Sequence, residues 1–305
     1  MTFLVVGESL VDLIGVGDTW TFEAAPGGSP LNVAVVLAAH GRPVRLASEL
    51  GDDMFGVLVR NHLRRHAVDA ADVVIADAPT SLAFAHLDAV GVATYDFRFG
   101  WRYAASPSLT GVDCLHIGSL GALVEPGGTV VRNLVRAARE GGVPVSYDPN
   151  VRPALIGERA TAVARVEELV ALADLVKVSA EDLAWLHPGR SAEATAGSWR
   201  DLGPGLVVVT HGAEGATALY DGGRTEVAAP RVTVVDTVGA GDTFTAGLLA
   251  ALADAGVLAA GRRPSLTPAT IEKAVRYATA AAAAVCTHRG ASPPTPEEIA
   301  ALLAA

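Results

Sequence analysis

Short runs rich in valine, leucine and isoleucine alternate along this chain with segments rich in alanine, leucine and arginine. The first kind has the composition of buried strands, and the second has the apolar spacing of helices. Because parallel neighbouring strands must be joined by a crossover, usually a helix, the alternation predicts an α/β fold with a mostly parallel sheet covered on both faces. We expect strands at residues 3–6, 44–48, 114–117, 143–147, 175–178 and 206–210.

The regular alternation breaks between residues 80 and 102. Segments 83–87 and 94–99 alternate apolar and polar residues on either side of Gly91, which is the pattern of a β-hairpin. With segments 11–14 and 20–22, this hairpin could form a small second sheet, drawn from residues 11–25 and 80–102. The chain has 305 residues and neither an internal repeat nor a low-complexity linker, so we expect residues 1–305 to form a single domain.

The segment that begins at Asp236 contains two glycines followed directly by an acid, in the order Gly239, Ala240, Gly241 and Asp242. The next residues, 243–254, have the composition and spacing of a helix. The turn would therefore present free backbone N–H groups at a helix N-terminus, where an anion such as phosphate is stabilised. Asp242 could also be an ordinary acid in a first helical turn, where the helix dipole favours it.

A second glycine turn lies far upstream, at Gly27 and Gly28, just before another predicted helix. Ser29 and Pro30 are residues that commonly begin a helix, so local helix chemistry explains them. It does not explain Asn32, one turn into the helix on the side of the paired glycines. An amide there is well placed to hydrogen-bond a polyhydroxylated ligand that approaches the backbone closely.

Together the two turns resemble the two signatures of the ribokinase-like (PfkB) sugar-kinase family. The first match runs from Gly27 to Gly56 and the second from Asp236 to Leu248, so the resemblance covers nearly the whole chain. It implies a ribokinase-like three-layer α/β/α fold in which the small sheet is a lid over the sugar. It also implies an ATP-dependent phosphotransferase that acts on a small alcohol.

The resemblance assigns roles to both turns. Asp242 is expected to be the general base that accepts the proton of the sugar hydroxyl. The N–H groups around Gly239, Ala240 and Gly241 are expected to form an anion hole for the phosphoryl group, whose transfer depends mainly on alignment and charge stabilisation. The residues expected to bind the sugar are Asp12, Gly27, Gly28, Asn32, Tyr95, Arg98 and Arg152.

On the nucleotide side, a loop after the strand at 206–210 matches the family's loop near the ATP phosphates, with Thr210, His211, Gly212 and Gly215. The family's acidic motif near magnesium is usually Asn-x-x-Glu, whereas this chain has Ser179 and Asp182 in its place. Asp182 could still orient water on Mg²⁺, which is often held through water and phosphates. The family also suggests a K⁺ site, for which the expected residues are Asp236, Val238, Val285, His288 and Gly290.

These motifs leave the acceptor open. Residues 7–12, 95–97 and 148–153 resemble bacterial fructokinases most. A 2-keto-3-deoxygluconate kinase is the close alternative, since Arg98 or Arg102 could pair with a substrate carboxylate, and ribokinase is the third. The alternative from another class is a non-catalytic sugar or nucleotide sensor on the same fold.

Composition limits the partners and the compartment. A net charge of −10 argues against nucleic-acid binding, which needs a positive surface. No uncharged apolar stretch reaches membrane-spanning length, and no basic residue precedes the first apolar run as it would in a signal peptide. Two cysteines are too few for a disulfide framework, so we expect a cytoplasmic protein. We also consider a homodimer formed through the lid.

Overall fold

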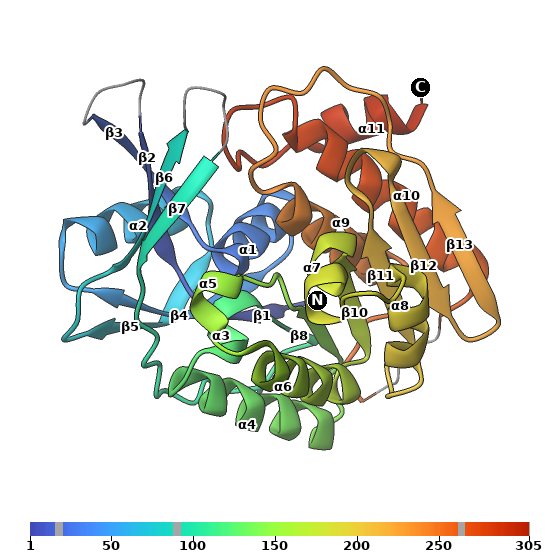
Figure 1. Cartoon of the computed structure of the whole chain (residues 1–305), viewed down its shortest axis with the longest axis horizontal. Helices are drawn as coiled ribbons and strands as arrows, with labels where there is room; N and C mark the ends of the chain where they lie inside the picture. Colours follow the sequence, from blue (N-terminus) through green and yellow to red (C-terminus); the bar gives the residue numbers. More distant parts are fainter. Residues whose placement is uncertain (16–20, 88–92, 262–265, 305) are drawn as a thin grey trace.

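The computed structural model describes residues 1–15, 21–87, 93–261 and 266–304. Within these ranges, a nine-stranded sheet lies between two layers of helices, and a four-stranded sheet stands to one side (Figure 1). The predicted three-layer α/β/α fold, its mostly parallel main sheet and the separate small sheet are confirmed. In the same ranges, every helix is too short or too polar to serve as a membrane span.

The main sheet is parallel from β11 (Leu206–Thr210) to β5 (Asp69–Ala76) in spatial order, and an antiparallel pair, β12 (Ala216–Tyr220) and β13 (Gly223–Val227), extends the edge next to β11. All six predicted strands are present. The strand predicted to start at Val143 begins at Val145, because the Val143 N–H bonds to the Ala138 carbonyl (2.8 Å) and Pro144 has no N–H. In spatial order the strands are β13 (Gly223–Val227), β12 (Ala216–Tyr220), β11 (Leu206–Thr210), β10 (Leu175–Ser179), β9 (Val145–Asp148), β8 (Cys114–Gly118), β1 (Phe3–Val6), β4 (Val44–Gly51) and β5 (Asp69–Ala76).

The strand β1 explains why both faces of the sheet need helices. Its side chains alternate, so Phe3 and Val5 enter one apolar core while Leu4 and Val6 enter another. The first core is closed by α1 (Ser29–Ala39), α9 (Ala240–Asp254) and α10 (Pro268–Val285). The second is closed by α3 (Ser119–Leu123), α4 (Gly127–Glu140), α6 (Arg159–Leu172), α7 (Ala180–Leu186) and α8 (Ala192–Arg200).

The small sheet has the order β3 (Phe22–Gly27), β2 (Leu10–Gly15), β6 (Ser81–Leu87) and β7 (Ala93–Arg98). Only the central pair, β2 and β6, is parallel. The strand predicted at 20–22 begins at Phe22, and Trp20 and Gly91 lie outside the described residues. Next to this sheet is α2 (Met54–Arg65), whose first turn is fixed by Asp53 accepting the Gly56 N–H (2.8 Å).

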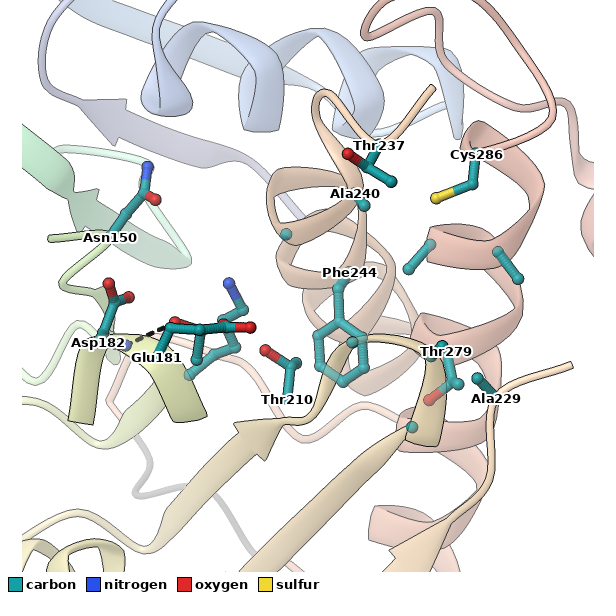
Figure 2. Close-up of a pocket in the computed structure, with 18 of the residues that line it drawn as sticks. Asn150, Glu181, Asp182, Thr210, Ala229, Thr237, Ala240, Phe244, Thr279 and Cys286 are labelled. Atoms are coloured by element: carbon teal, nitrogen blue, oxygen red, sulfur yellow. Dashed lines mark hydrogen bonds between the residues drawn. The ribbon is translucent and has the colours of Figure 1, made fainter. Parts of the chain in front are cut away.

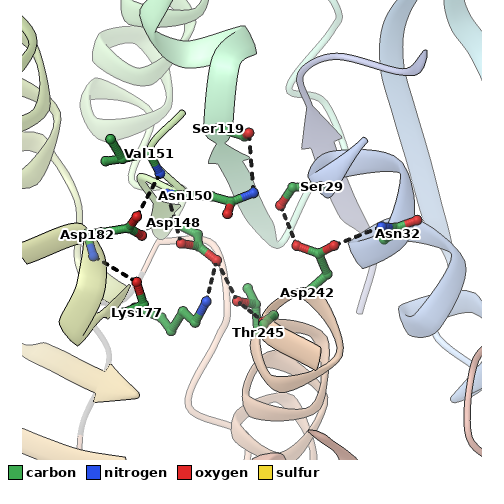
Figure 3. A network of polar contacts seen from close by, with 12 residues as sticks. Ser29, Asn32, Ser119, Asp148, Asn150, Val151, Lys177, Asp182, Asp242 and Thr245 are labelled. Atoms are coloured by element: carbon green, nitrogen blue, oxygen red, sulfur yellow. Dashed lines mark hydrogen bonds and ion pairs between the residues drawn. The ribbon is translucent and has the colours of Figure 1, made fainter. Parts of the chain in front are cut away.

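Because the central strands are parallel, their carboxyl ends share one edge of the sheet, where ligands usually bind in open α/β folds. β9 ends at Asp148, β10 at Ser179 and β11 at Thr210. The helix α9 begins at the same edge, near the first turn of α1 (Figure 3). Two short elements complete this region, α5 (Pro153–Ile156) and η1 (Gly212–Glu214), and α11 (Pro296–Ala304) ends the described chain.

Candidate active site

Asp242 lies in the first turn of α9, and its carboxylate faces the first turn of α1 (Figure 3). Oδ1 accepts a hydrogen bond from Ser29 Oγ (2.6 Å), and Oδ2 accepts one from Asn32 Nδ2 (2.8 Å). The two glycine turns, 213 residues apart at Ser29 and Asp242, therefore meet in space. Burial raises the pKa of Asp242 and the two hydrogen bonds oppose that rise, so the carboxylate is a stronger base than an exposed Asp.

The backbone at the start of α9 supplies N–H donors beside this carboxylate. Gly239 has a left-handed conformation (φ 78°) and precedes the helix. The Ala240 N–H already donates to the Thr237 carbonyl (3.2 Å), and the first helical hydrogen bond joins the Thr243 N–H to the Gly239 carbonyl (2.8 Å). The N–H groups left for a ligand are therefore those of Gly239, Gly241 and Asp242. Of the three residues in the predicted anion hole, Gly239 and Gly241 keep an N–H for a ligand, and the Ala240 N–H is already used.

A cavity of about 630 Å³, here called the smaller cavity, lies beside Asp242 and is lined in part by the small sheet. Asp12 on β2 lines it, as do Gly28, Asn32 and Arg152. Burial, and then the charge of Asp242, raises the pKa of Asp12 to about 6, while Arg152 lowers it. Polar side chains from the small sheet, from α1 and from the loop after β9 thus face one space.

Gly27 does not line the smaller cavity, although the sequence suggested that it binds the sugar. Its role is to leave room, because a Cβ at this position would lie 2.1 Å from Asp12 Oδ2. Gly28 does line the cavity, and its positive φ of 105° carries the chain into α1.

The small-sheet strand β7 presents Phe97 to the smaller cavity, not Arg98. Adjacent residues on a strand point to opposite faces, and Arg98 is exposed and paired with Asp96 (2.7 Å). Arg98 was predicted to bind the sugar, but the structure places it away from the cavity. Tyr95 belongs to β7, but its side chain is outside the described part of the chain.

A cavity of about 870 Å³, the larger cavity, lies on the other side of the α9 turn (Figure 2). Thr210, Gly212 and Gly215 line it, as the sequence predicted for the strand-end loop. His211 is absent from its lining, since its Nε2 lies 3.1 Å from Thr217 Oγ1. Phe244 and Thr279 add an apolar wall and a hydroxyl from α9 and α10.

Ser179 and Asp182 also line the larger cavity, and Ser179 begins α7 by accepting the Asp182 N–H (3.0 Å). Asp182 Oδ1 in turn accepts the Val151 N–H (3.2 Å), which ties α7 to the loop after β9. Burial, and then the charge of Asp148, raises the pKa of Asp182 to about 6. A metal cation beside this partly protonated, poorly solvated carboxyl group would stabilise its ionised form.

The two cavities meet at the α9 turn. Ala240 and Gly241 line both of them, and so do Asn150 and Arg152 from the loop after β9. A group held at the junction would have the Gly241 backbone on one side and the Arg152 guanidinium on another. This arrangement allows a ligand in the larger cavity to pass an anionic group to an acceptor in the smaller one.

Comparison with known proteins agrees with this geometry. A model of the pfkB family of carbohydrate kinases matches residues 2–298. The chain belongs to this family. A fructokinase from Rhizobium leguminosarum bv. trifolii is 36% identical to the kinase over 259 residues, which cover 82% of this chain and 79% of that protein.

Solved structures are similar to the kinase over nearly its whole length. A fructokinase from Xylella fastidiosa with bound ATP has a TM-score of 0.89 at 28% identity, covering 99% of this chain and 98% of that one. A double-mutant fructokinase from Vibrio cholerae, with fructose, ADP and a potassium ion bound, has a TM-score of 0.85 at 29% identity and the same coverage.

The residues predicted to hold a monovalent cation brace the α9 turn of the kinase. Asp236 accepts the Val238 N–H at Oδ1 (3.0 Å) and the Gly290 N–H at Oδ2 (2.9 Å). The Val285 carbonyl accepts the His288 N–H (3.0 Å), and the His288 ring lies 2.9 Å from Glu298. The oxygens that this loop offers a monovalent cation include its backbone carbonyls and the Asp236 carboxylate. Among the described residues no cluster of three or more His, Cys, Asp or Glu side chains forms a metal site.

Asn150, Phe97 and Lys177 are among the residues that line these cavities and that sequence reasoning did not assign to the site of the kinase. Asn150 follows a proline in a strand-end turn, so turn chemistry alone accounted for it. Phe97 lies in an alternating strand pattern and Lys177 in an apolar one, and neither pattern shows which cavity a side chain reaches.

Proposed function

We propose that this carbohydrate kinase transfers the γ-phosphoryl group of ATP to a hydroxyl of a small neutral sugar, with fructose as the preferred acceptor. The observation that carries the proposal is the junction of the two cavities at Gly241, directly beside the Asp242 carboxylate. The larger cavity has the volume expected for a nucleotide site, and the smaller one has the polar lining expected for a sugar site. The relatives named as fructokinases support the choice of acceptor.

In the proposed reaction, the sugar hydroxyl lies between Asp242 and the terminal phosphoryl group of ATP. The bond from the γ-phosphorus to the oxygen that bridges it to the β-phosphate breaks, and a bond to the sugar oxygen forms. The hydroxyl proton passes to Asp242, and ADP leaves. Ser29 and Asn32 hold the carboxylate in place through both of its oxygens, so its orientation is set before the sugar binds.

The phosphoryl group would be stabilised by the start of α9. The N–H groups of Gly239, Gly241 and Asp242 would donate to it, and the positive end of the helix dipole lies at the same place. In comparable sites, losing one such donor lowers kcat by about 10² to 10³. Arg152 lines both cavities and would add a guanidinium that can donate to two phosphoryl oxygens.

Two cations complete the proposal. Mg²⁺ would be held by the ATP phosphates and by Asp182, which fits the habit of this ion of taking few carboxylates and keeping several waters. When bound, it neutralises charge on the phosphates. K⁺ would lie in the Asp236 loop among backbone carbonyls and brace the α9 turn, in line with the ion found in the Vibrio cholerae fructokinase.

The charges around the smaller cavity favour a neutral acceptor. The carboxyl groups of Glu8, Asp12 and Asp242 line it, whereas Arg152 is its only Lys or Arg among the described residues. Arg98, which could have bound a substrate carboxylate, lies away from the cavity and pairs with Asp96. A sugar acid would therefore meet mainly like charge, which favours fructose over 2-keto-3-deoxygluconate.

The test is ADP release by the purified protein with ATP, Mg²⁺, and fructose, ribose, 2-keto-3-deoxygluconate or adenosine in turn. We expect the kcat/KM for fructose to exceed the others by about tenfold or more, since polar contacts in a built site discriminate at least that strongly. A higher value for the sugar acid or for adenosine would overturn the acceptor. ATP binding without turnover on any acceptor would instead favour the sensor.

The proposal includes a cytoplasmic location and a homodimer. Cys114 and Cys286 are both free thiols, as expected in a reducing compartment. In the lid sheet, β3 and β7 are the edge strands, and an exposed strand edge is a natural surface for pairing with a second copy. Sedimentation of the purified protein as a monomer at micromolar concentration would contradict the dimer.

A further inference from the structure

A buried lysine, Lys177, lies where the two cavities meet. It belongs to β10, is 6% exposed, and lines the larger cavity together with Gly241. Its ammonium approaches the glycine closely, because a Cβ added at Gly241 would lie 3.0 Å from Lys177 Nζ. The positive charge therefore lies directly against the turn whose N–H groups face the junction.

Asp148, at the end of β9, holds this ammonium (Figure 3). Its Oδ2 accepts hydrogen bonds from Lys177 Nζ (2.9 Å) and Thr245 Oγ1 (3.1 Å), and its Oδ1 accepts the Asn150 N–H (3.2 Å). These bonds fix the carboxylate, and the carboxylate fixes the ammonium. Asp148 is the one hydrogen-bond partner of Nζ among the described residues, so two of the three ammonium donors are left for a ligand.

The choice of lysine at this position is informative. The chain has 23 lysine and arginine residues, but only Lys177 and Lys273 are lysines. A guanidinium is wider and planar, whereas the ammonium of Lys177 is compact and lies directly against Gly241. The site thus has a small cation in a chain whose other Lys and Arg residues are, apart from Lys273, all arginines.

The surrounding charges keep Lys177 protonated. Burial lowers the pKa of Lys177, but the nearby charges of Asp148, Asp242 and Asp182 together outweigh burial and raise it. Of these carboxylates, Asp148 already has several donors, whereas Asp242 belongs to the smaller cavity and Asp182 to the larger one. The ammonium is therefore a permanent positive charge between the proposed sugar and metal positions.

We propose that Lys177 is a catalytic cation that donates hydrogen bonds to the terminal phosphoryl group of ATP, and that Asp148 is the positioning residue that orients it. The proposal rests on the proposed function and adds a group that it did not use. As the phosphoryl group moves from ADP to the sugar oxygen, negative charge on its oxygens stays within reach of Nζ. Lys177 keeps its proton throughout, since the hydroxyl proton goes to Asp242.

The test uses the double variant Lys177→Met/Asp148→Asn in the full chain. Both charges are replaced together because Lys177→Met alone would leave the Asp148 charge buried and unpaired, which destabilises a fold strongly. We expect kcat to fall by about 10² to 10³, as for other lost donors in such sites. The KM for fructose should change by less than about threefold, because the smaller cavity is left intact.

The decisive readout is the difference between two nucleotides measured by calorimetry. The Kd for an ATP analogue with nitrogen at the β–γ bridge should rise by about 10- to 100-fold, because hydrogen bonds to a charged group are lost. The Kd for ADP, which lacks the terminal phosphoryl group, should rise by less than about threefold. A merely structural lysine would weaken both nucleotides alike, and that result would overturn the proposal.

Two further variants separate a specific role of Lys177 from a general loss of structure. Lys273→Met removes the only other lysine, on the exposed face of α10, and should change neither nucleotide affinity. Asp148→Asn alone keeps the ammonium but weakens its positioning, and should weaken the ATP analogue more than ADP even if the double variant does not fold. Equal loss for both nucleotides there also counts against Lys177. A wild-type protein that binds ATP but phosphorylates no sugar would refute the proposed function while leaving the nucleotide comparison valid.

Discussion

Replacement of Glu8 by glutamine should make the ligand-free kinase more stable at alkaline pH. Glu8 follows β1, is 2% exposed, and its Oε2 accepts the Gly121 N–H at the start of α3 (2.7 Å). Burial raises the pKa of Glu8 from 4.5 to about 7, although the hydrogen bonds of Ser119 and Gly121 oppose the rise. Glutamine keeps an oxygen for the Gly121 N–H and carries no charge to bury.

The sign and size of the effect follow from this pKa. Well below pH 4.5 the carboxyl group is protonated in the folded and the unfolded chain, so it leaves the free energy of unfolding unchanged. As the pH rises from 4.5 to about 7, the unfolded chain ionises first, and the folded chain loses stability. The full loss is on the order of 3 kcal/mol, of which about 2 kcal/mol falls between roughly pH 5.5 and pH 8.

Urea unfolding of wild type and Glu8→Gln, each without ligands, measures this difference. We expect the stability advantage of the variant to grow by about 2 kcal/mol from roughly pH 5.5 to pH 8. Glu272→Gln, on the exposed face of α10, is the control and should give parallel pH profiles for variant and wild type. Parallel profiles for Glu8→Gln, or a variant that loses stability as the pH rises, would refute the reasoning about buried carboxyls at this site.

Three other predictions concern catalysis. Asp242→Asn should keep ATP affinity and lose at least about a hundredfold in kcat, and near-normal turnover would exclude it as the base. An excess of chelator should abolish turnover, whereas activity that survives would rule out Mg²⁺ on the phosphates. Replacing K⁺ by a bulky organic cation should slow the reaction, and equal rates in the two salts would count against the Asp236 site.

The two glycine turns could be recognised from the sequence because they state local backbone requirements. A turn with little side-chain bulk before a helix is determined by neighbouring residues. Gly28, Gly239 and Gly241 could therefore be identified before the fold was known. Their meeting at Ser29 and Asp242 followed only from the family resemblance, since nothing local links residues 213 positions apart. The alternating strands and helices were predicted for the same reason, as each is a local pattern.

The positions of the residues that sequence reasoning misplaced depend on contacts between segments that are separate in the sequence. Period-two alternation separates Phe97 from Arg98, but the pairing of β7 with β6 decides which of them faces the cavity. His211 was assigned with its loop, yet its ring turns toward Thr217 on the next strand. Lys177 reads as one polar residue in an apolar strand, and its position becomes meaningful only beside Asp148, 29 residues away.

The most direct test of the account is to follow the phosphoryl group itself. Purified wild-type protein would be incubated with fructose, Mg²⁺ and ATP labelled at the γ-phosphate, and the products separated. We predict that the label appears on the sugar in a one-to-one ratio with ADP, because the acceptor and the nucleotide meet at Gly241 and water is not the acceptor. Label released as inorganic phosphate, or ATP bound and left intact beside every sugar, would contradict the central claim.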